Sequence, residues 1–462
     1  MTRILRLALI VSIVMITSVV AQLPGAAAAA VAGWWTGQLT GTALHLTLQV
    51  QRRGQAWDGV LFSLDQSPNG MPATVTVQGN RVVAAVAAAQ GTFAGTLQGD
   101  RLVGSWTQSG HSLALTLQKL QLTQRPRPPY PYRSLTVTVP SVKGIQLAGT
   151  LTVPQGKGPF PAAILIAGSG PHGRNEDLFG HQIFWVLADS LSRHGLAVLR
   201  VDKRGIGKSG GDYATATTED FARDVAAGLV FLQKQSEIDP HRIGLIGHSE
   251  GGLIAPIVAS RHRRAVAFVV MLAGPALPGS AIIVAQTVAA NRVAGASPAA
   301  LARIRVEETK FVDTVKSAPD AAAVPAALRA AVNQKELPAA VLRAAAVASS
   351  PWYYEFLKLD PAPYLRQLRC PVLALDGSKD TQVPAAENIP ALDAALANDP
   401  HATIVAMTGL NHVFQPAKTG ALDEYASSPI TFAPAALHRI EQWLAGVVGT
   451  RAPQPQVSSP RL

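Results

Sequence analysis

The feature that most constrains the fold of this 462-residue chain is a five-residue turn, Gly247-His248-Ser249-Glu250-Gly251. The apolar run before it, residues 242–246, is typical of a buried strand, and the residues from 252 to 258 are typical of a helix. So sharp a strand-to-helix turn strains the backbone at the serine, and small residues at positions 247 and 251 avoid clashes there. Because such a turn holds the hydroxyl out above the sheet, Ser249 is a candidate nucleophile.

The region from residue 134 onward has the alternation that is typical of a mostly parallel sheet. Short apolar runs alternate with helical stretches, and helices of this kind connect parallel strands. The clearest predicted strands span residues 162–167, 196–201, 242–247, 266–273, 371–376 and 402–408. We therefore predict an α/β domain over residues 134–447.

The strand pattern is interrupted between residues 278 and 363, a segment rich in Ala, Arg and Glu. It contains helical stretches such as residues 299–315, broken by Pro325 and Pro338. A connection this long needs structure of its own. We predict a helical cap inserted between two strands and lying over the site, and the alternative is a helical excursion packed away from the site.

Residues 33–122 differ in composition and predict a separate all-β domain. Apolar and polar residues alternate with the period of a strand. A motif of an aromatic residue, x-Gly-x and an aliphatic residue recurs at 35–39, 57–61 and 93–97, and more loosely at Gly104 and Trp106. Glycines at fixed places in alternating strands indicate bulges or corners of a small antiparallel barrel or sandwich.

Residues 1–32 have the pattern of a secretory signal peptide. Arg3 and Arg6 form a basic start, an apolar run covers residues 7–20, and small residues precede Gly33. We therefore expect cleavage before Gly33 and an exported protein, periplasmic or secreted. After removal of the leader the protein is not expected to be an integral membrane protein; an uncleaved anchor is the alternative.

Two other segments lie outside the predicted domains. Residues 123–133 predict a stiff linker, because four of the seven residues at 125–131 are prolines. Residues 448–462 are rich in Pro, Ser and Gln and predict a disordered tail.

Composition and charge exclude some classes of protein. Hydrophobic residues make up 48% of the chain and charged residues 15%, which is typical of a globular protein and not of a disordered one. The formal net charge is +11, and loss of Arg3 and Arg6 with the leader leaves +9. The sequence has no basic run interleaved with aromatics, so we expect a solvated basic surface and no nucleic-acid partner.

A serine nucleophile at neutral pH needs a base, and in a chain with this kind of turn the order is serine, acid, histidine. His401 precedes the predicted strand at 402–408 and so lies at the wrong end of the sheet. His438 lies in a terminal amphipathic helix, where a surface or core role is expected. His412 follows the strand 402–408 and a short turn, at the end where Ser249 must also lie, and we predict that it is the base.

The orienting acid should follow an earlier strand at the same end of the sheet. The predicted strand at 371–375 leads into two candidates, Asp376 and Asp380. Asp376 is at the edge of the strand, where it could cap the turn. Asp380 is further along the loop and better placed to reach an imidazole, so we prefer Asp380.

The oxyanion that develops during acyl transfer needs preorganised hydrogen-bond donors. One predicted donor is the backbone N–H of Glu250, directly after the nucleophile. The second should come from the Gly-rich turn 168–173, with Ser169 N–H as first choice and Gly170 as second. An ordinary Gly-rich turn is the alternative.

Three segments together resemble the bacterial EstD-like esterases of the serine-aminopeptidase-like branch of the α/β-hydrolases, over residues 134 to 445. The matching motifs are Gly168-Ser169-Gly170-Pro171, Asp202-Lys203-Arg204-Gly205-Ile206-Gly207-Lys208-Ser209 and Gly247-His248-Ser249-Glu250-Gly251-Gly252.

This resemblance implies an α/β-hydrolase fold and carboxylesterase activity on small-molecule esters with short acyl chains. Ser249, Asp380 and His412 match the family triad, and no metal or cofactor is implied. Lys203 stands where the family pattern has a second aspartate, which puts the role of that position in doubt. The flanking Asp202 and Arg204 are expected to brace their loop.

Two other functions are kept as alternatives. A serine peptidase of the aminopeptidase type would use the same triad, and would need an acidic pair to bind a free α-amino group. Glu176, Asp177 and Glu250 are the acids near the predicted site. A non-catalytic binding protein built on a hydrolase scaffold is the third alternative, and the complete triad argues against it.

Overall fold

A computed structural model describes residues 30–332 and 339–450 of the chain. The predicted signal peptide, except for its last three residues, and the tail beyond residue 450 lie outside the described residues. The chain divides into two compact units, Met1–Phe62 with Gly70–Lys119, and Ser63–Asn69 with Leu120–Leu462. Within the described residues, no helix is long and apolar enough to cross a membrane.

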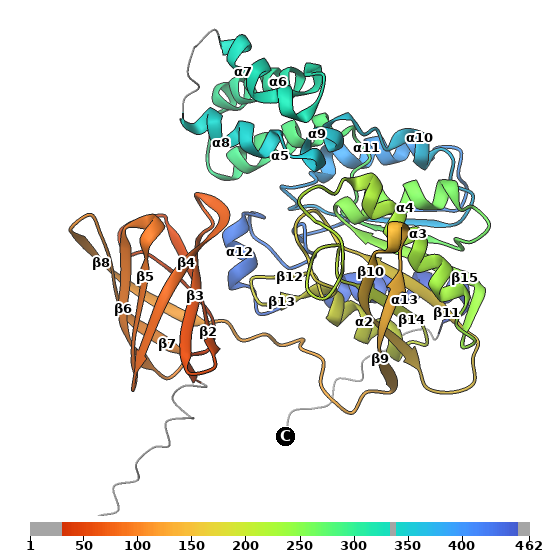
Figure 1. Ribbon diagram of the computed structural model, residues 1–462, viewed down its shortest axis with the longest axis horizontal. Helices are drawn as coiled ribbons and strands as arrows, with labels where there is room; N and C mark the ends of the chain where they lie inside the picture. Colours follow the sequence, from red (N-terminus) through yellow and green to blue (C-terminus); the bar gives the residue numbers. More distant parts are fainter. Residues whose placement is uncertain (1–29, 333–338, 451–462) are drawn as a thin grey trace, which may run out of the picture. The chain divides into compact units, whose positions relative to one another are not determined.

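The first unit confirms the predicted all-β domain as a closed, eight-stranded antiparallel barrel (Figure 1). Each strand pairs with the next along the chain, and the first strand pairs with the eighth to close the barrel. Side chains fill the interior, as is usual for a barrel of eight strands. The strands are β1 (Gly33–Gln38), β2 (His45–Arg53), β3 (Ala56–Ser63), β4 (Ser67–Gln78), β5 (Arg81–Val86), β6 (Gly91–Gln98), β7 (Arg101–Gln108) and β8 (His111–Lys119).

The recurring aromatic and glycine residues of the barrel have a steric explanation. The side chains of Trp35 and Phe93 are buried in the interior. A Cβ atom on Gly37 would lie 2.1 Å from the carbonyl oxygen of Thr116, and one on Gly104 would lie 2.1 Å from that of Ala94. These glycines therefore permit strand-to-strand approaches that no other residue allows.

The linker is partly anchored to the second unit. Thr123 N–H donates to the carbonyl of Pro429, and the Gln124 side chain accepts from the backbone N–H groups of Thr431 and Phe432. No strand is formed between residues 120 and 131, and the next strand begins at Tyr132, within the predicted linker.

The second unit is built on an eight-stranded sheet with the order β18-β17-β16-β15-β11-β14-β10-β9. β10 is antiparallel to both of its neighbours, and the other pairs are parallel. All six strands predicted from the sequence are present. The strands are β9 (Tyr132–Pro140), β10 (Gln146–Pro154), β11 (Phe160–Ile166), β14 (Ala197–Val201), β15 (Ile238–His248), β16 (Val269–Leu272), β17 (Val372–Gly377) and β18 (Ala402–Met407).

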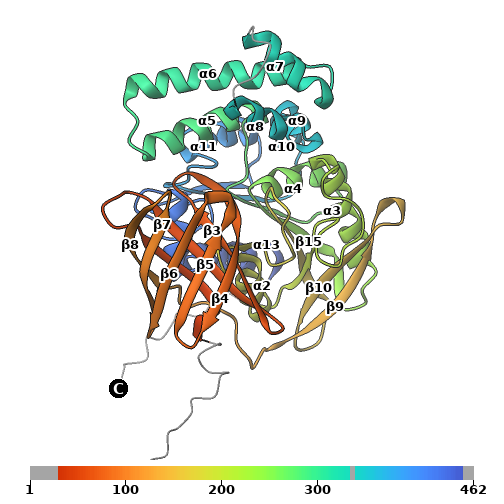
Figure 2. The ribbon, with the colours of Figure 1, turned by 60° about the vertical axis from the view of Figure 1, so that its left-hand side comes forward.

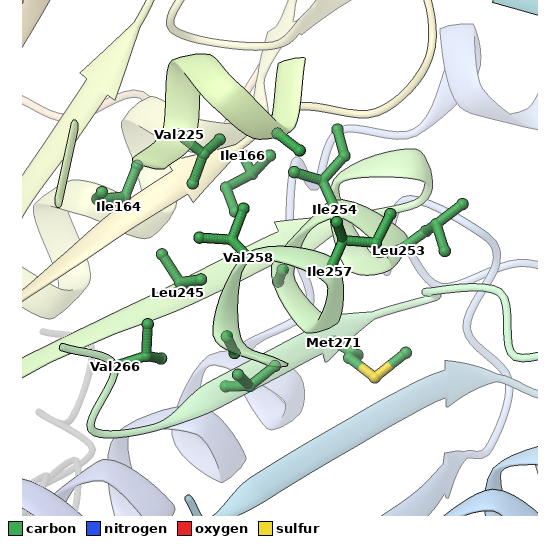
Figure 3. Close-up of a cluster of buried hydrophobic side chains, with 14 of the residues drawn as sticks. Ile164, Ile166, Val225, Leu245, Leu253, Ile254, Ile257, Val258, Val266 and Met271 are labelled. Atoms are coloured by element: carbon green, nitrogen blue, oxygen red, sulfur yellow. The ribbon is translucent and has the colours of Figure 1, made fainter. Parts of the chain in front are cut away.

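Helices pack against this sheet and bury an apolar core (Figure 3). Leu253, Ile254, Ile257 and Val258 of α4 lie among side chains of β11, β15, β16 and α3 in this core. The centre of the sheet is therefore a rigid support for the turn between β15 and α4. Apart from the cap helices and the short helix after them, the helices of the second unit are α2 (Ile183–Arg193), α3 (Thr218–Gln233), α4 (Glu250–Arg261), α11 (Ala385–Leu396), α12 (Leu422–Ser427) and α13 (Pro434–Val448), and it also has a two-strand hairpin of β12 (Asp177–Leu178) and β13 (His181–Gln182).

The predicted helical cap is confirmed between β16 and β17, and forms its own helical group in Figures 1 and 2. Val312, Val315, Leu328 and Leu357 belong to a separate small core within it. The cap helices are α5 (Gly279–Val293), α6 (Pro298–Ser317), α7 (Val324–Val332), α8 (Ala339–Ala348) and α9 (Pro351–Lys358), followed by α10 (Ala362–Leu365).

Candidate active site

Ser249 lies on the turn between β15 and α4, as the sequence predicted. Its backbone has φ 52° and ψ −120°, in a region that a non-glycine residue adopts only under strain. The strain is held by the neighbouring strand, because Ser249 N–H donates to the carbonyl of Leu272 at 2.9 Å. The residue is half-buried and directly follows the end of β15, at the C-terminal edge of the sheet.

The two flanking glycines are required by the backbone packing. A Cβ on Gly247 would lie 1.9 Å from the carbonyl oxygen of Gly251, and a Cβ on Gly251 would lie 1.9 Å from that of Ile166. Both contacts are with backbone atoms that cannot rotate away. No residue with a Cβ atom therefore fits at position 247 or 251 without a shift of the backbone.

We expect Gly251→Ala to destabilise the protein by at least about 3 kcal/mol, because β11 and α4 must separate to admit the methyl group. Urea unfolding at equilibrium measures this loss. Gly446→Ala is the matched control, since a Cβ there meets no atom within 4 Å and α13 should gain up to about 1 kcal/mol. Equal stability of the two variants would contradict the packing explanation.

Asp380 and His412 are in contact. His412 Nδ1 lies 2.8 Å from Asp380 Oδ2, and both side chains are buried. The other oxygen of Asp380 accepts the backbone N–H groups of Gln382 at 2.7 Å and Val383 at 2.8 Å. These bonds fix the carboxylate, which in turn orients the imidazole so that Nε2 remains for a substrate or a nucleophile.

Asp376, the alternative acid, has a different environment. It is fully buried at the end of β17, and its Oδ2 accepts from Asn388 Nδ2 at 2.9 Å. Burial raises its pKa to about 7, from an ordinary value of 3.8. Asn388 also bonds the backbone of Gly274 and Ala276, so Asp376 belongs to a bracing network of the sheet edge, whereas His412 Nδ1 is bonded to Asp380.

The raised pKa of Asp376 makes stability depend on pH. Between its unfolded and folded pKa values the folded state binds the extra proton, so stability falls as pH rises from about 4 to about 7. Asparagine at this position does not titrate. We expect the stability of Asp376→Asn relative to wild type to rise by on the order of 2 kcal/mol between about pH 5 and about pH 8, measured by urea unfolding. A relative stability that is constant with pH would show that Asp376 does not titrate in this range.

The first residues of the Gly-rich turn 168–173 are held in place by hydrogen bonds. Gly168 N–H donates to Glu176 Oε1 at 2.6 Å, and Gly168 O accepts from Lys203 Nζ at 2.5 Å. The Ser169 carbonyl is 2.8 Å from His172 Nε2, and the Gly170 carbonyl accepts from His172 N–H at 2.9 Å.

Within the part of the chain that the structure describes, the backbone N–H of Ser169 has no protein acceptor. Glu250 N–H is in the first turn of α4, where amides lack an intrahelical carbonyl. The two predicted oxyanion donors are therefore both available to a ligand.

The side chain of Glu250 is buried and has three partners. Lys203 Nζ lies 3.2 Å from Oε2, while Thr218 Oγ1 and the indole nitrogen of Trp352 donate to Oε1 at 2.7 Å and 2.6 Å. Lys203, the departure from the family motif, therefore bridges Glu250 and the Gly168 turn. Trp352 is on α9, so the cap is bonded to the residue that follows Ser249.

Asp202 and Arg204 brace their loop, as expected. Asp202 receives two side-chain bonds from Arg174, at 2.6 Å and 3.0 Å. Arg204 forms a bidentate pair with Asp224 on α3, at 2.7 Å and 2.9 Å. Both pairs therefore connect the loop to its neighbouring segments, and the bonds of all four side chains are made away from the triad.

Sequence reasoning did not assign roles to two residues that contact this site. His248 Nδ1 lies 2.9 Å from Glu176 Oε1, and His248 Nε2 lies 3.0 Å from the carbonyl oxygen of His412. From the sequence, Glu176 is a candidate only for binding an amine. The only sequence signal for His248 is its place beside Ser249, and nothing in the sequence pairs it with Glu176, 72 residues earlier.

The strand order with one antiparallel strand, the strained serine turn and the Asp380–His412 pair define a protein of the α/β-hydrolase class. Within that class the chain belongs to the serine aminopeptidase S33 family, whose model matches residues 171–414.

Individual relatives cover different shares of this chain and of their own length. Esterase EstD of Thermotoga maritima is 29% identical over 238 residues, which are 51% of this chain and 50% of the relative, so the chain spans only half of that relative's length. A solved esterase of Pyrococcus furiosus is 16% identical, with 71% of this chain and 98% of that one covered and a TM-score of 0.45. A puromycin-hydrolyzing peptidase of Mycobacterium tuberculosis is 14% identical, with 87% and 53% covered and a TM-score of 0.45.

Proposed function

We propose that this protein is a serine carboxylesterase that cleaves small esters with short acyl chains through an acyl-enzyme on Ser249. The observation that carries the proposal is the 2.8 Å contact between His412 and the buried Asp380, at the sheet edge where Ser249 is held on its strained turn. The similarity to an esterase over half of the chain supports the ester as substrate.

In the first half of the reaction, Ser249 Oγ attacks the carbonyl carbon of the ester while its proton passes to His412 Nε2. Asp380 holds the imidazole with Nδ1–H directed at its carboxylate and stabilises the imidazolium. The carbonyl oxygen becomes an oxyanion, bound by the backbone N–H groups of Glu250 and Ser169. When the intermediate collapses, the alcohol leaves with the proton from His412 and the acyl group stays on Ser249.

The second half repeats these steps with water. His412 takes a proton from a water molecule, whose oxygen attacks the acyl carbon, and the same two amides bind the new oxyanion. Collapse returns the proton to Ser249 Oγ and releases the carboxylic acid. No cofactor or metal takes part in this proposal.

The aminopeptidase alternative is less well supported, because the acids near the site are already engaged. Glu250 is paired with Lys203, and Glu176 with His248. Asp177 accepts from Gln182 at the exposed hairpin of β12 and β13. An α-amino group would therefore have to displace a buried partner before either buried carboxylate could bind it.

The test has two parts. A fluorophosphonate probe should label the wild-type protein, with the label at Ser249 by peptide mass spectrometry. A panel of acyl-nitrophenyl esters and aminoacyl-nitroanilides then separates esters from amides. We expect turnover of short acyl esters. If Ser249 is labelled but only the anilides are turned over, the esterase proposal is wrong and the peptidase alternative takes its place.

We also propose that the protein is exported and that its mature chain begins near Gly33, from the leader pattern of residues 1–32. Mass spectrometry of the protein recovered outside the cytoplasm measures this directly. We expect a mass that lacks the leader, and a mass that includes Met1 would contradict cleavage.

A further inference from the structure

We infer that Glu176 and His248 form a buried ion pair that positions both the proposed base and the oxyanion turn, with His248 as a doubly protonated imidazolium. These two residues are positioning residues, and neither is assigned to touch substrate. The inference rests on the proposed function of Ser249 and His412 and adds a role to two residues outside the triad.

The geometry of Glu176 links two parts of the site through one oxygen. Its Oε1 accepts from the Gly168 N–H at 2.6 Å and from His248 Nδ1 at 2.9 Å. Glu176 is 2% exposed, and its backbone has φ 50°, a strained value for a non-glycine residue. A residue kept in this conformation is held there by its surroundings, and strain of this kind concentrates at functional sites.

The protonation of His248 follows from its two partners. Nδ1 faces a carboxylate oxygen and Nε2 faces the carbonyl oxygen of His412, and both partners are acceptors only. A neutral imidazole has one donor, whereas the imidazolium has two, so opposite an ionised Glu176 only the charged form satisfies both contacts. Burial opposes this charge, but the carboxylate of Glu176 outweighs it and raises the pKa of His248. The imidazolium correspondingly lowers the pKa of Glu176 despite its burial.

The pair joins three separate segments. Gly168 opens the turn that carries Ser169, His248 precedes Ser249, and His412 follows β18. The ring centroids of His248 and His412 lie 4.8 Å apart. Because the His412 side chain is also bonded to Asp380, the base is fixed at its carbonyl and at its ring. A loss of either bond lets the imidazole shift relative to Ser249.

Stability alone does not explain a buried ion pair between Glu176 and His248. Buried ion pairs add little stability compared with apolar residues, because removing two charges from water is costly. The chain also offers a buried histidine for comparison. His181 contacts a hydroxyl, Thr431 Oγ1, and a carbonyl, that of Tyr425, and burial lowers its pKa to about 4. Since a hydroxyl can donate, a neutral imidazole satisfies His181.

The first experiment measures protonation on the wild-type protein. In ¹⁵N-histidine NMR at neutral pH we expect one buried histidine, absent from His248→Gln spectra, to carry protons on both ring nitrogens. His181, identified in the same way with His181→Gln, should carry one. A His248 with a single protonated nitrogen would overturn the inference, and this result is independent of whether the protein hydrolyses esters.

The second experiment measures positioning. We expect His248→Gln to lower kcat about 10- to 100-fold, with KM changed less than about threefold, since misplacing a catalytic group by a fraction of an ångström has effects of this size. The rate of fluorophosphonate labelling should fall by the same factor, which tests positioning even if no ester is turned over. His181→Gln, a matched loss of a buried and doubly bonded histidine, should leave both rates within about threefold of wild type.

The third variant tests the connection between the two residues. In the double variant Glu176→Gln/His248→Gln, the amide introduced at position 176 can donate to the amide introduced at position 248. The second amide can in turn donate to the His412 carbonyl, so the chain of bonds is restored without charge. We expect the double variant to label faster than His248→Gln alone.

The single variant Glu176→Gln should also label slowly, because it removes the charge that holds His248 in its doubly protonated form. This variant keeps the test available if His248→Gln does not fold. Wild-type labelling rates in both single variants would overturn the inference.

Discussion

Ser249→Ala is expected to abolish turnover of every ester that the wild-type protein cleaves, and His412→Ala to do nearly the same. The loss for each should be on the order of 10⁶ in kcat, as for the equivalent pair in a well-studied serine hydrolase. The two residues act as one unit, because the hydroxyl attacks only as it loses its proton to the imidazole. The double variant should therefore be no slower than either single variant.

Steady-state kinetics with a short acyl-nitrophenyl ester measures these losses, and urea unfolding checks that each variant is folded. Asp224→Asn is the control for the loss of a buried polar contact, since Asp224 pairs with Arg204 away from the triad. Substantial turnover by folded Ser249→Ala would assign the chemistry to another residue.

The second large effect separates two aspartates that are four residues apart. Asp380→Asn should lower kcat by on the order of 10⁴, because an amide that donates to Nδ1 selects the wrong imidazole tautomer. Asp376→Asn should change kcat less than about tenfold, because the Asp376 side chain bonds Asn388 and is not bonded to His412.

Comparing the two variants side by side removes the general effect of an aspartate-to-asparagine change at this end of the sheet. Both should be assayed at a pH of about 8 and checked for folding. An inactive, folded Asp376→Asn together with an active Asp380→Asn would reverse the assignment of the acid and leave Ser249 and His412 in their roles.

Features that depend on local pattern could be predicted from the sequence. The turn at Ser249 has its glycines, its incoming strand and its outgoing helix within a short stretch, and each of them has a recognisable local sequence pattern. The cap could be predicted because residues 278–363 lack the apolar runs of a sheet. The choice of Asp380 and His412 needed only the order of strands, since parallel strands end at one edge of the sheet.

Features that depend on contacts between distant segments could not be predicted. Glu176 and His248 meet only because β11 and β15 are neighbours in the sheet, which sequence order alone does not show. Lys203 was an unexplained departure from the family pattern, because its partner Glu250 is 47 residues away. The buried position of Asp376 also has no local signal, since its neighbour Asn388 comes from the following helix.

The bond between Trp352 and Glu250 has a consequence for how this protein can evolve or be engineered. The cap residue Trp352 is tied to the same residue whose backbone amide is proposed to bind the oxyanion. Substitutions that move α9 to admit a bulkier substrate will therefore also displace that amide. Variant libraries that keep Trp352 and vary the remainder of the cap should broaden substrate specificity with the smallest loss of turnover rate. In libraries that also vary position 352, variants that accept more substrates should turn them over more slowly.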